Sequence, residues 1–120
     1  MFLKQRDFLF IKTNHLLDDK LIFVVCLIYK TRKILSDLKL ELVKKYPIAS
    51  IGLFGSIVRD DFTKNSDIDI IVEFNDKVGI EFIDLANELE EKLNSKVDLV
   101  SRGGMRQKYF KVIEPEIIYI

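Results

Sequence analysis

The chain has 120 residues, of which 48% are hydrophobic and 32% charged, and 19 Lys and Arg side chains balance 19 Asp and Glu side chains. This length suits one domain, and the apolar fraction excludes a disordered or low-complexity chain. A net charge of zero argues against a dedicated nucleic-acid-binding protein, which normally carries a basic surplus.

The charges are unevenly distributed along the chain. Residues 1–49 hold ten Lys/Arg against five Asp/Glu, a net charge of +5, whereas residues 50–120 hold nine against fourteen, a net charge of −5. A local acidic excess is either a plain solvated surface or a set of carboxylates that binds cations. Composition leaves both readings open.

The single cysteine, Cys26, excludes an internal disulfide and a cysteine-based zinc site, and its apolar neighbours predict a core position. The apolar run Leu21–Tyr29 is nine residues long, whereas a membrane-spanning helix needs roughly 20. The start of the chain places acidic residues within the apolar region and lacks a small-residue cleavage site, so we expect no secretory signal. We therefore expect a cytoplasmic protein that binds no membrane.

The first 30 residues contain clustered apolar side chains without a sustained period, and Leu21–Tyr29 fits either a buried strand or part of a helix. From Thr31 onward apolar residues recur at helical spacing. This periodicity predicts a helix over Thr31–Lys45 that ends before Pro47. We treat residues 1–30 as an N-terminal extension and residues 31–120 as the main domain.

Two strands are predicted in the middle of the chain. The sequence IASIGLF at residues 48–54 predicts a short buried strand that leads into Gly55-Ser56, after which Ile57–Asp61 is expected to form a helical turn. Ser66–Asn75 alternates strongly between apolar and polar residues, which predicts a second strand. One face of that strand carries Ile68, Ile70, Val72 and Phe74, and the other carries Asp67, Asp69, Ile71 and Glu73.

The C-terminal half continues the alternation of helices and strands. We expect a helix over Ile80–Asn94, a strand over Lys96–Ser101, a short helix over Met105–Ile113 and a final strand over Glu116–Ile120. This order predicts an α+β domain with α/β-like character, in which a small sheet is backed by helices.

The first candidate for chemistry is the pair Asp67 and Asp69. Two positions apart on a strand, their carboxylates lie on one face and repel each other, and no Lys or Arg lies next to them on that face. A divalent cation is the natural counter-ion, and hard oxygen ligands suit Mg²⁺ or Mn²⁺. Because Mg²⁺ held by few carboxylates completes its shell with water and substrate phosphates, the pair indicates a nucleotide substrate.

Asp98 is the third candidate carboxylate. It lies in the middle of the predicted strand Lys96–Ser101, and Val97 and Leu99 lie on the opposite face. If this strand lies beside Ser66–Asn75, Asp98 joins the other two acids. A site with three carboxylates can hold two metal ions, one that activates an acceptor oxygen and one that stabilises the leaving phosphate.

Gly55-Ser56 lies where a strand meets a helical turn. Glycine lets the backbone come close to a phosphate, and main-chain N–H groups together with the Ser56 hydroxyl can hold phosphate oxygens. Arg59, one turn later, can reach the same phosphates as a charge-assisted donor. Taken alone, a Gly-Ser is most often a turn, an Asp-x-Asp a solvated face and an arginine a surface charge. Their fixed order and spacing together favour a functional site.

This arrangement resembles a known signature. Gly55-Ser56, ten intervening residues and then Asp67-Ile68-Asp69 are similar to the nucleotidyltransferase motif of the DNA polymerase β-like superfamily. Arg59 and Ser66 also match positions that are often filled in this way in its small members. The match is closest to the MNT-type minimal nucleotidyltransferases, which include the antitoxins paired with HEPN ribonuclease toxins, and it covers Thr31–Ile120.

The resemblance implies a short mixed sheet with helices on one side, and a reaction in which a nucleoside monophosphate passes from an NTP to a hydroxyl and pyrophosphate is released. For an MNT antitoxin the donor is usually ATP and the acceptor is a tyrosine hydroxyl of the HEPN toxin, whose RNase activity is thereby lost. The implied assembly is a hetero-oligomer with the toxin, without direct contact to nucleic acid.

The same resemblance implies a role for each site residue. Gly55 and Ser56 hold the β- and γ-phosphates, and Ser66 joins the nucleotide site. Asp67 and Asp69 bind two Mg²⁺ (or Mn²⁺) ions, and Asp98 binds the catalytic ion and helps to deprotonate the acceptor hydroxyl. Arg59 as a phosphate ligand is our own inference from its spacing.

Two other functions stay open at this stage. The first is a binding module that neutralises its partner by occlusion, with idle carboxylates, which the opposite charges of the two halves and the unassigned N-terminal segment favour. The second is a nucleotidyltransferase for a small molecule such as an aminoglycoside. Larger enzymes of that kind carry an extra helical domain, and we expect none in this chain, which makes this reading the least favoured.

Overall fold

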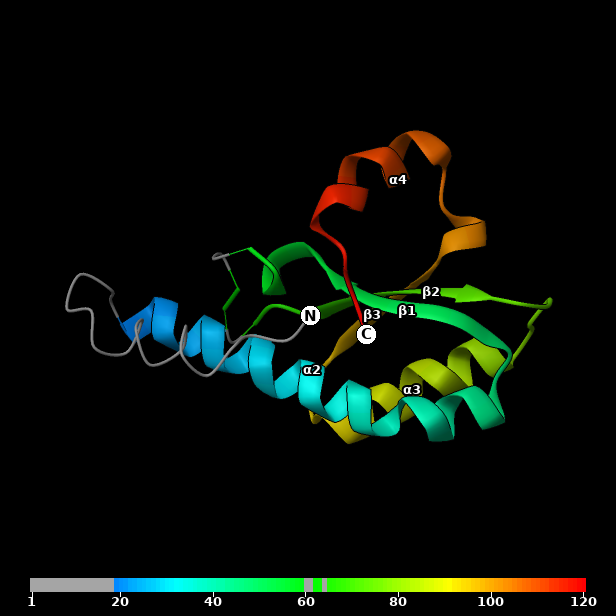
Figure 1. The fold of residues 1–120 in the computed structure, drawn as a ribbon, viewed down its shortest axis with the longest axis horizontal. Helices are drawn as coiled ribbons and strands as arrows, with labels where there is room; N and C mark the ends of the chain where they lie inside the picture. Colours follow the sequence, from blue (N-terminus) through cyan, green and yellow to red (C-terminus); the bar gives the residue numbers. More distant parts are fainter. Residues whose placement is uncertain (1–18, 60–61, 64) are drawn as a thin grey trace.

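The computed structural model describes residues 19–59, 62–63 and 65–120. Its centre is a four-stranded sheet in the order β3-β2-β1-β4 (Figure 1). The strands are β1 (Ile48–Phe54), β2 (Ile68–Phe74), β3 (Val97–Ser101) and β4 (Ile118–Tyr119). Strands β2 and β3 run parallel, whereas β1 is antiparallel to both β2 and β4. The mixed sheet confirms the predicted fold class, and β4 is shorter than the expected Glu116–Ile120.

Helix α2 (Asp19–Lys45) is the longest element, and it begins well before the predicted start at Thr31. The ambiguous run Leu21–Tyr29 is therefore helical. The buried residues of this helix explain its length. Their spacing keeps them on one stripe of the helix surface: Val24, Thr31, Leu35 and Leu42.

Cys26 does not lie in the core, contrary to our expectation, because the helix turns it away from the stripe that contains Val24, and its side chain is exposed. The proposed boundary between residues 30 and 31 falls inside α2. Residues 1–18 of the predicted N-terminal extension lie outside the described residues, so this division of the chain stays a prediction.

Helices α2 and α3 (Glu81–Leu93) cover one face of the sheet (Figure 1). Helix α3 packs Leu85, Leu89 and Leu93 against the same core as the buried stripe of α2. The two helices are also joined by polar contacts, since the Glu88 carboxylate lies 3.0 Å from Lys45 Nζ and accepts a hydrogen bond of 3.0 Å from Tyr46 Oη. The alternation predicted for β2 is confirmed on this face, where Ile68, Ile70 and Val72 are buried.

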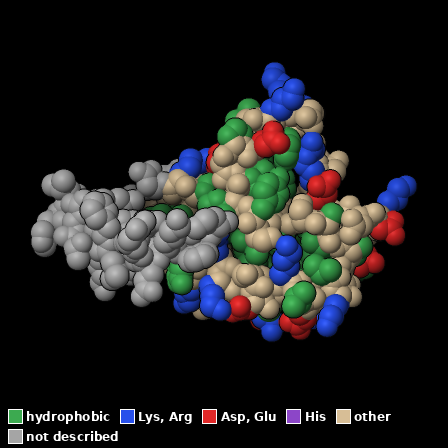
Figure 2. All heavy atoms as spheres, in the orientation of Figure 1, with side chains coloured by type: hydrophobic (Ala, Val, Ile, Leu, Met, Phe, Trp, Pro, Cys, Tyr) green, Lys and Arg blue, Asp and Glu red, His purple; other side chains and the backbone are tan. Residues whose placement is uncertain are grey.

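Helix α4 (Gln107–Ile113) covers the opposite face of the sheet (Figure 1), so the implied placement of all helices on one side is wrong. Phe110 and Ile113 of α4 form a second, smaller core with Phe54 and Ile71. Ile71 is thus buried although it lies on the acidic face of β2. Hydrophobic side chains gather at the surface in this part of the molecule, and charges of both signs surround them (Figure 2).

Three short 3₁₀ helices connect these elements: η1 (Gly55–Ile57), η2 (Arg102–Gly104) and η3 (Glu114–Glu116). The expected helical turn at Ile57–Asp61 is thus replaced by η1, which begins two residues earlier, and residues 60 and 61 lie outside the described part. Among the described helices, none is sufficiently long and apolar to span a membrane.

The packing of α2 yields a direct test. Leu35→Ala is expected to lower the free energy of unfolding by about 2–5 kcal/mol, because this side chain is 1% exposed and its truncation leaves a cavity. Leu40→Ala is the matched control, since Leu40 lies on the same helix but is 77% exposed, and we expect a change below about 0.5 kcal/mol. Urea denaturation followed by circular dichroism measures both, and equal losses would contradict this assignment of the helix face.

Candidate active site

The parallel register of β2 and β3 brings two of the predicted acids together. Asp69 on β2 and Asp98 on β3 are direct register partners, so both lie at the same level of the sheet. They share the face of the sheet that α4 covers further along, because Ile68 and Ile70, which flank Asp69, are buried on the other face. The two strands are thus neighbours, as the expected gathering of the three acids requires, and Asp98 lies beside Asp69.

The Asp69 carboxyl has an unusual protonation equilibrium. Its pKa is raised from 3.8 to about 6, first by burial and then by the negative charge of Asp98 and a hydrogen bond shared with that residue, while the charge of Asp67 adds a smaller effect. A hydrogen bond from the main-chain N–H of Ser56 opposes this rise. Asp69 therefore holds its proton to a higher pH than an ordinary aspartate does, and a bound cation can take the place of that proton.

Asp67 lies just before the first residue of β2, and its side chain is exposed. Its charge acts on Asp69, so the three predicted acids occupy one region. Among the described residues, however, no three His, Cys, Asp or Glu side chains are gathered closely enough to form a metal-binding group. The structure thus assembles the Asp69–Asp98 pair fully and leaves Asp67 at its edge.

The turn at Gly55 is shaped by the Asp69 carboxylate. Gly55 has a φ of +78°, in the left-handed region, and a Cβ added there would overlap Asp69 Oδ2. Glycine is thus required at this position by backbone conformation and by close approach at once. Because β1 and β2 are paired from Ile48 and Phe74 to Phe54 and Asp69, the turn directly follows the end of the ladder next to the acids.

The main-chain N–H groups expected to be available for phosphate are occupied by carboxylates. Gly55 N donates a hydrogen bond of 2.8 Å to Glu116 Oε2, and Ser56 N–H donates to Asp69. Ser66, the other predicted nucleotide ligand, closes the turn before β2, where its Oγ accepts a hydrogen bond of 3.0 Å from Thr63 N. Contacts between Ser66 and a nucleotide stay a prediction.

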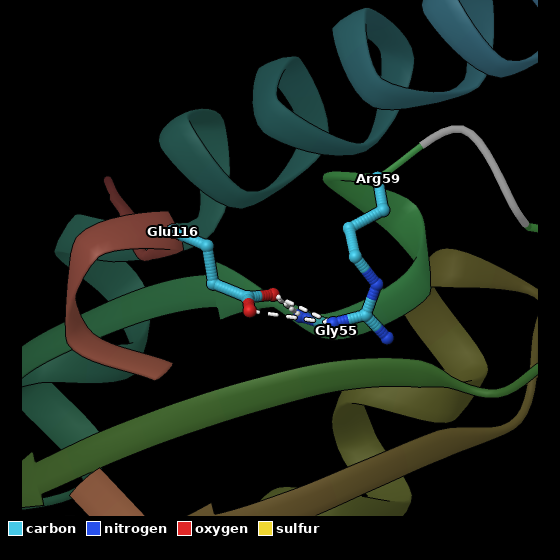
Figure 3. Close-up of polar contacts among 3 residues, drawn as sticks. All are labelled: Gly55, Arg59 and Glu116. Atoms are coloured by element: carbon cyan, nitrogen blue, oxygen red, sulfur yellow. Dashed lines mark hydrogen bonds and ion pairs between the residues drawn. The ribbon is translucent and has the colours of Figure 1, made fainter. Parts of the chain in front are cut away.

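Arg59 reaches back toward the Gly55 turn and meets Glu116 (Figure 3). Its Nη1 lies 3.2 Å from Glu116 Oε2 and 3.3 Å from Oε1. Our reading of the sequence did not identify Glu116 as a site residue. It is remote from Gly55 in the chain, and the only local signal around it is the apolar run that follows.

The family model of the nucleotidyltransferase domain matches residues 35–119. The chain therefore belongs to the nucleotidyltransferase domain family, and the paired acids, with the glycine-serine turn beside them, are its candidate active site.

Individual relatives agree with this assignment. The protein adenylyltransferase MntA of Thermococcus cleftensis is 35% identical over 88 residues, which cover 72% of this chain and 89% of that protein. Among solved structures, a complex of tri-AMPylated Shewanella oneidensis HEPN toxin with MNT antitoxin matches with a TM-score of 0.57 and 26% identity, covering 74% of this chain and 70% of the other. A toxin–antitoxin structure with AMP-PNP matches with a TM-score of 0.52 and 32% identity, covering 61% of each chain.

The Gly55 turn can be tested by substitution. Gly55→Ala is expected to lower the free energy of unfolding by at least about 1 kcal/mol, because alanine is strained at positive φ and its Cβ displaces the Asp69 carboxylate. Gly79→Ala is the control, since a Cβ there meets nothing closer than 3.7 Å. Thermal unfolding by calorimetry compares the two variants. A Gly55→Ala protein as stable as Gly79→Ala would show that the turn adopts another conformation.

The raised pKa of Asp69 predicts a pH dependence for the metal-free protein. The folded state retains a proton that the unfolded state releases, so the stability due to this group is fully present below about pH 3.8 and is lost as the pH rises through about 6. Relative to Asp69→Asn, the wild-type free energy of unfolding is therefore expected to fall over this range.

The matched control for this measurement is Glu73→Gln, which removes an exposed carboxylate from the same strand. Its unfolding free energy, measured by urea denaturation at each pH in the presence of a chelator, is expected to follow the wild-type profile. Parallel wild-type and Asp69→Asn profiles would contradict the perturbed titration of Asp69.

Proposed function

We propose that this protein is a Mg²⁺-dependent protein adenylyltransferase that transfers AMP from ATP to a hydroxyl of a partner HEPN toxin and thereby acts as its antitoxin in the cytoplasm. The observation that carries the proposal is the register of β2 and β3, which sets Asp69 beside Asp98 and next to the Gly55-Ser56 turn. The name of the Thermococcus cleftensis relative and the contents of the matched toxin–antitoxin structures support the same activity.

The acids suit a divalent cation. All three donors are carboxylate oxygens, which Mg²⁺ and Mn²⁺ prefer, and the raised pKa of Asp69 reflects a negative environment that a cation would neutralise. Asp69 and Asp98 would hold the metal, with Asp67 joining them from the edge of the strand. When bound, Mg²⁺ supplies the positive charge that stabilises the leaving phosphates and lowers the pKa of the acceptor hydroxyl.

The remaining residues of the site bind and orient the donor. The missing side chain of Gly55 lets the chain turn tightly beside Asp69, and the Ser56 hydroxyl and the Arg59 guanidinium meet the β- and γ-phosphates. Ser66 lies in the turn before Asp67 and completes this end of the nucleotide site. In this arrangement positioning and electrostatic stabilisation supply most of the catalysis, as in other phosphoryl-transfer enzymes.

The transfer step is a single displacement at the α-phosphorus. The acceptor oxygen, which we propose to be that of a tyrosine on the toxin, forms the new bond to phosphorus. The bond between the α-phosphorus and its bridging oxygen to the β-phosphate breaks, and pyrophosphate leaves. Asp98 accepts the hydroxyl proton, a role that suits a carboxylate at the exposed edge of the pair.

This function predicts which phosphate is transferred. Purified protein incubated with Mg²⁺, source-cell lysate and ATP labelled at the α-phosphate is expected to yield one labelled partner band, whose mass identifies the toxin. ATP labelled at the γ-phosphate should leave the band unlabelled, because that phosphate departs in pyrophosphate. The Asp67→Ala/Asp69→Ala variant is expected to lose the signal.

Glu73→Ala is the control, since it removes an exposed carboxylate from the same strand and should preserve labelling. Equal transfer by the wild type and by the Asp67→Ala/Asp69→Ala variant would refute the proposal. If the double variant transfers no AMP but still binds the partner and protects cells as well as the wild type does, the protein is instead an antitoxin that acts by occlusion.

A further inference from the structure

Glu116 contacts two residues of the candidate site but has no role in the proposed reaction. Its carboxylate accepts hydrogen bonds from Gly55 N at 2.8 Å and from Arg59 Nη1 at 3.2 Å (Figure 3). Glu116 lies 61 positions after Gly55 and 57 positions after Arg59 in the chain. One side chain from the C-terminal segment thus joins the main chain at the start of η1 to the arginine that follows it.

This contact differs from an ordinary surface ion pair. Exposed ion pairs contribute little to stability. The Arg59 side chain, which is 53% exposed, would by itself indicate such a pair. Glu116, however, is only 25% exposed, and one of its oxygens also accepts from the main chain of Gly55, a buried residue. Hydrogen bonds to a charged acceptor are stronger than those between neutral groups, and two donors fix the orientation of the carboxylate.

The Gly55 turn is consequently held from two sides. Glu116 receives the N–H of Gly55, and Asp69 receives the N–H of the next residue, Ser56. Two carboxylates from different elements therefore hold successive main-chain N–H groups of the turn, and one of them also contacts the Arg59 guanidinium. Asp69 belongs to the pair of acids, whereas Glu116 lies on η3 and contacts the turn and Arg59.

The segment that carries Glu116 is firmly attached to the sheet. Ile118 and Tyr119 pair with β1 at Leu53 and Gly52, and Lys39 Nζ on α2 donates a hydrogen bond of 2.7 Å to the Ile120 carbonyl oxygen. Ile117 packs against the second core. An element anchored in this way is suited to holding a neighbour in place, and less suited to moving aside whenever a ligand arrives.

We propose that Glu116 is a positioning residue for the nucleotide. It fixes Arg59 and the Gly55 turn in the orientation in which they meet the β- and γ-phosphates of ATP. This inference rests on the proposed function. An alternative role for Glu116 predicts the opposite effect of its removal on nucleotide binding. If Glu116 were instead an internal anion occupying the phosphate position, the triphosphate would have to displace it, and its removal would strengthen nucleotide binding.

The test is the dissociation constant of the intact protein for Mg²⁺-ATP, measured by calorimetry. Glu116→Gln keeps an oxygen acceptor for Gly55 N but loses the charge that holds Arg59, and we expect it to raise the dissociation constant roughly five-fold. Glu114→Gln is the control, because Glu114 has an exposed side chain on the same 3₁₀ helix. It is expected to bind as tightly as the wild type.

Two further comparisons separate positioning from a general loss of structure. The affinity for AMP, which lacks the β- and γ-phosphates, should be the same for Glu116→Gln and the wild type. In an Arg59→Ala background, Glu116→Gln should have no further effect on ATP binding, because glutamine keeps the acceptor for Gly55 N and the charged contact with Arg59 is already gone.

Tighter ATP binding by Glu116→Gln, an unchanged dissociation constant, an equal loss for AMP, or a full additional loss without Arg59 would each overturn the inference. In those cases ATP binding and AMP transfer by the wild type leave the proposed function in place. A wild-type protein that binds no ATP would overturn the proposed function, and the inference with it.

Discussion

The site depends on one unfavourable arrangement, which is the placement of two carboxyl groups side by side on parallel strands. The register of β2 and β3 makes Asp69 and Asp98 neighbours, and burial makes the repulsion between them more costly. Two like charges about 4 Å apart near a protein surface repel by on the order of 4 kcal/mol, so the arrangement favours the binding of a proton or of a cation. The raised pKa of Asp69 reflects the first outcome, and the proposed Mg²⁺ site is the second.

The elements around this pair of acids position the other residues of the site. Helices α2 and α3 bury one face of the sheet, and α4 buries Ile71 and Phe54, the β1 register partner of Asp69, on the other. The Gly55 turn lies against Asp69 because glycine has no Cβ to prevent it. The C-terminal strand then completes the site from the opposite edge by bringing Glu116 to the same turn.

Patterns local in the chain predicted much of this architecture. The alternation in Ser66–Asn75 located β2 and its acidic face, and the Gly55-Ser56 and Asp-x-Asp spacing indicated the family. Contacts between distant segments were harder to predict. The sequence near Ile71 contains no signal that α4 covers this residue, so its alternation with polar residues predicts an exposed face. The position of Glu116 depends on the β1–β4 pairing, which joins segments that are distant in the chain. Cys26 was misplaced because a short apolar run does not distinguish a helix from a strand.

The central claim is that the paired acids and the glycine-serine turn form one site for a metal and a triphosphate. The most direct measurement is a crystal structure of the protein grown with Mn²⁺ and a non-hydrolysable ATP analogue, in which anomalous scattering locates the metal. The account predicts Mn²⁺ bound to Asp69 and Asp98, with the triphosphate against Ser56 and Arg59. Nucleotide bound elsewhere, or Mn²⁺ absent from the acids while the analogue is present, would contradict it.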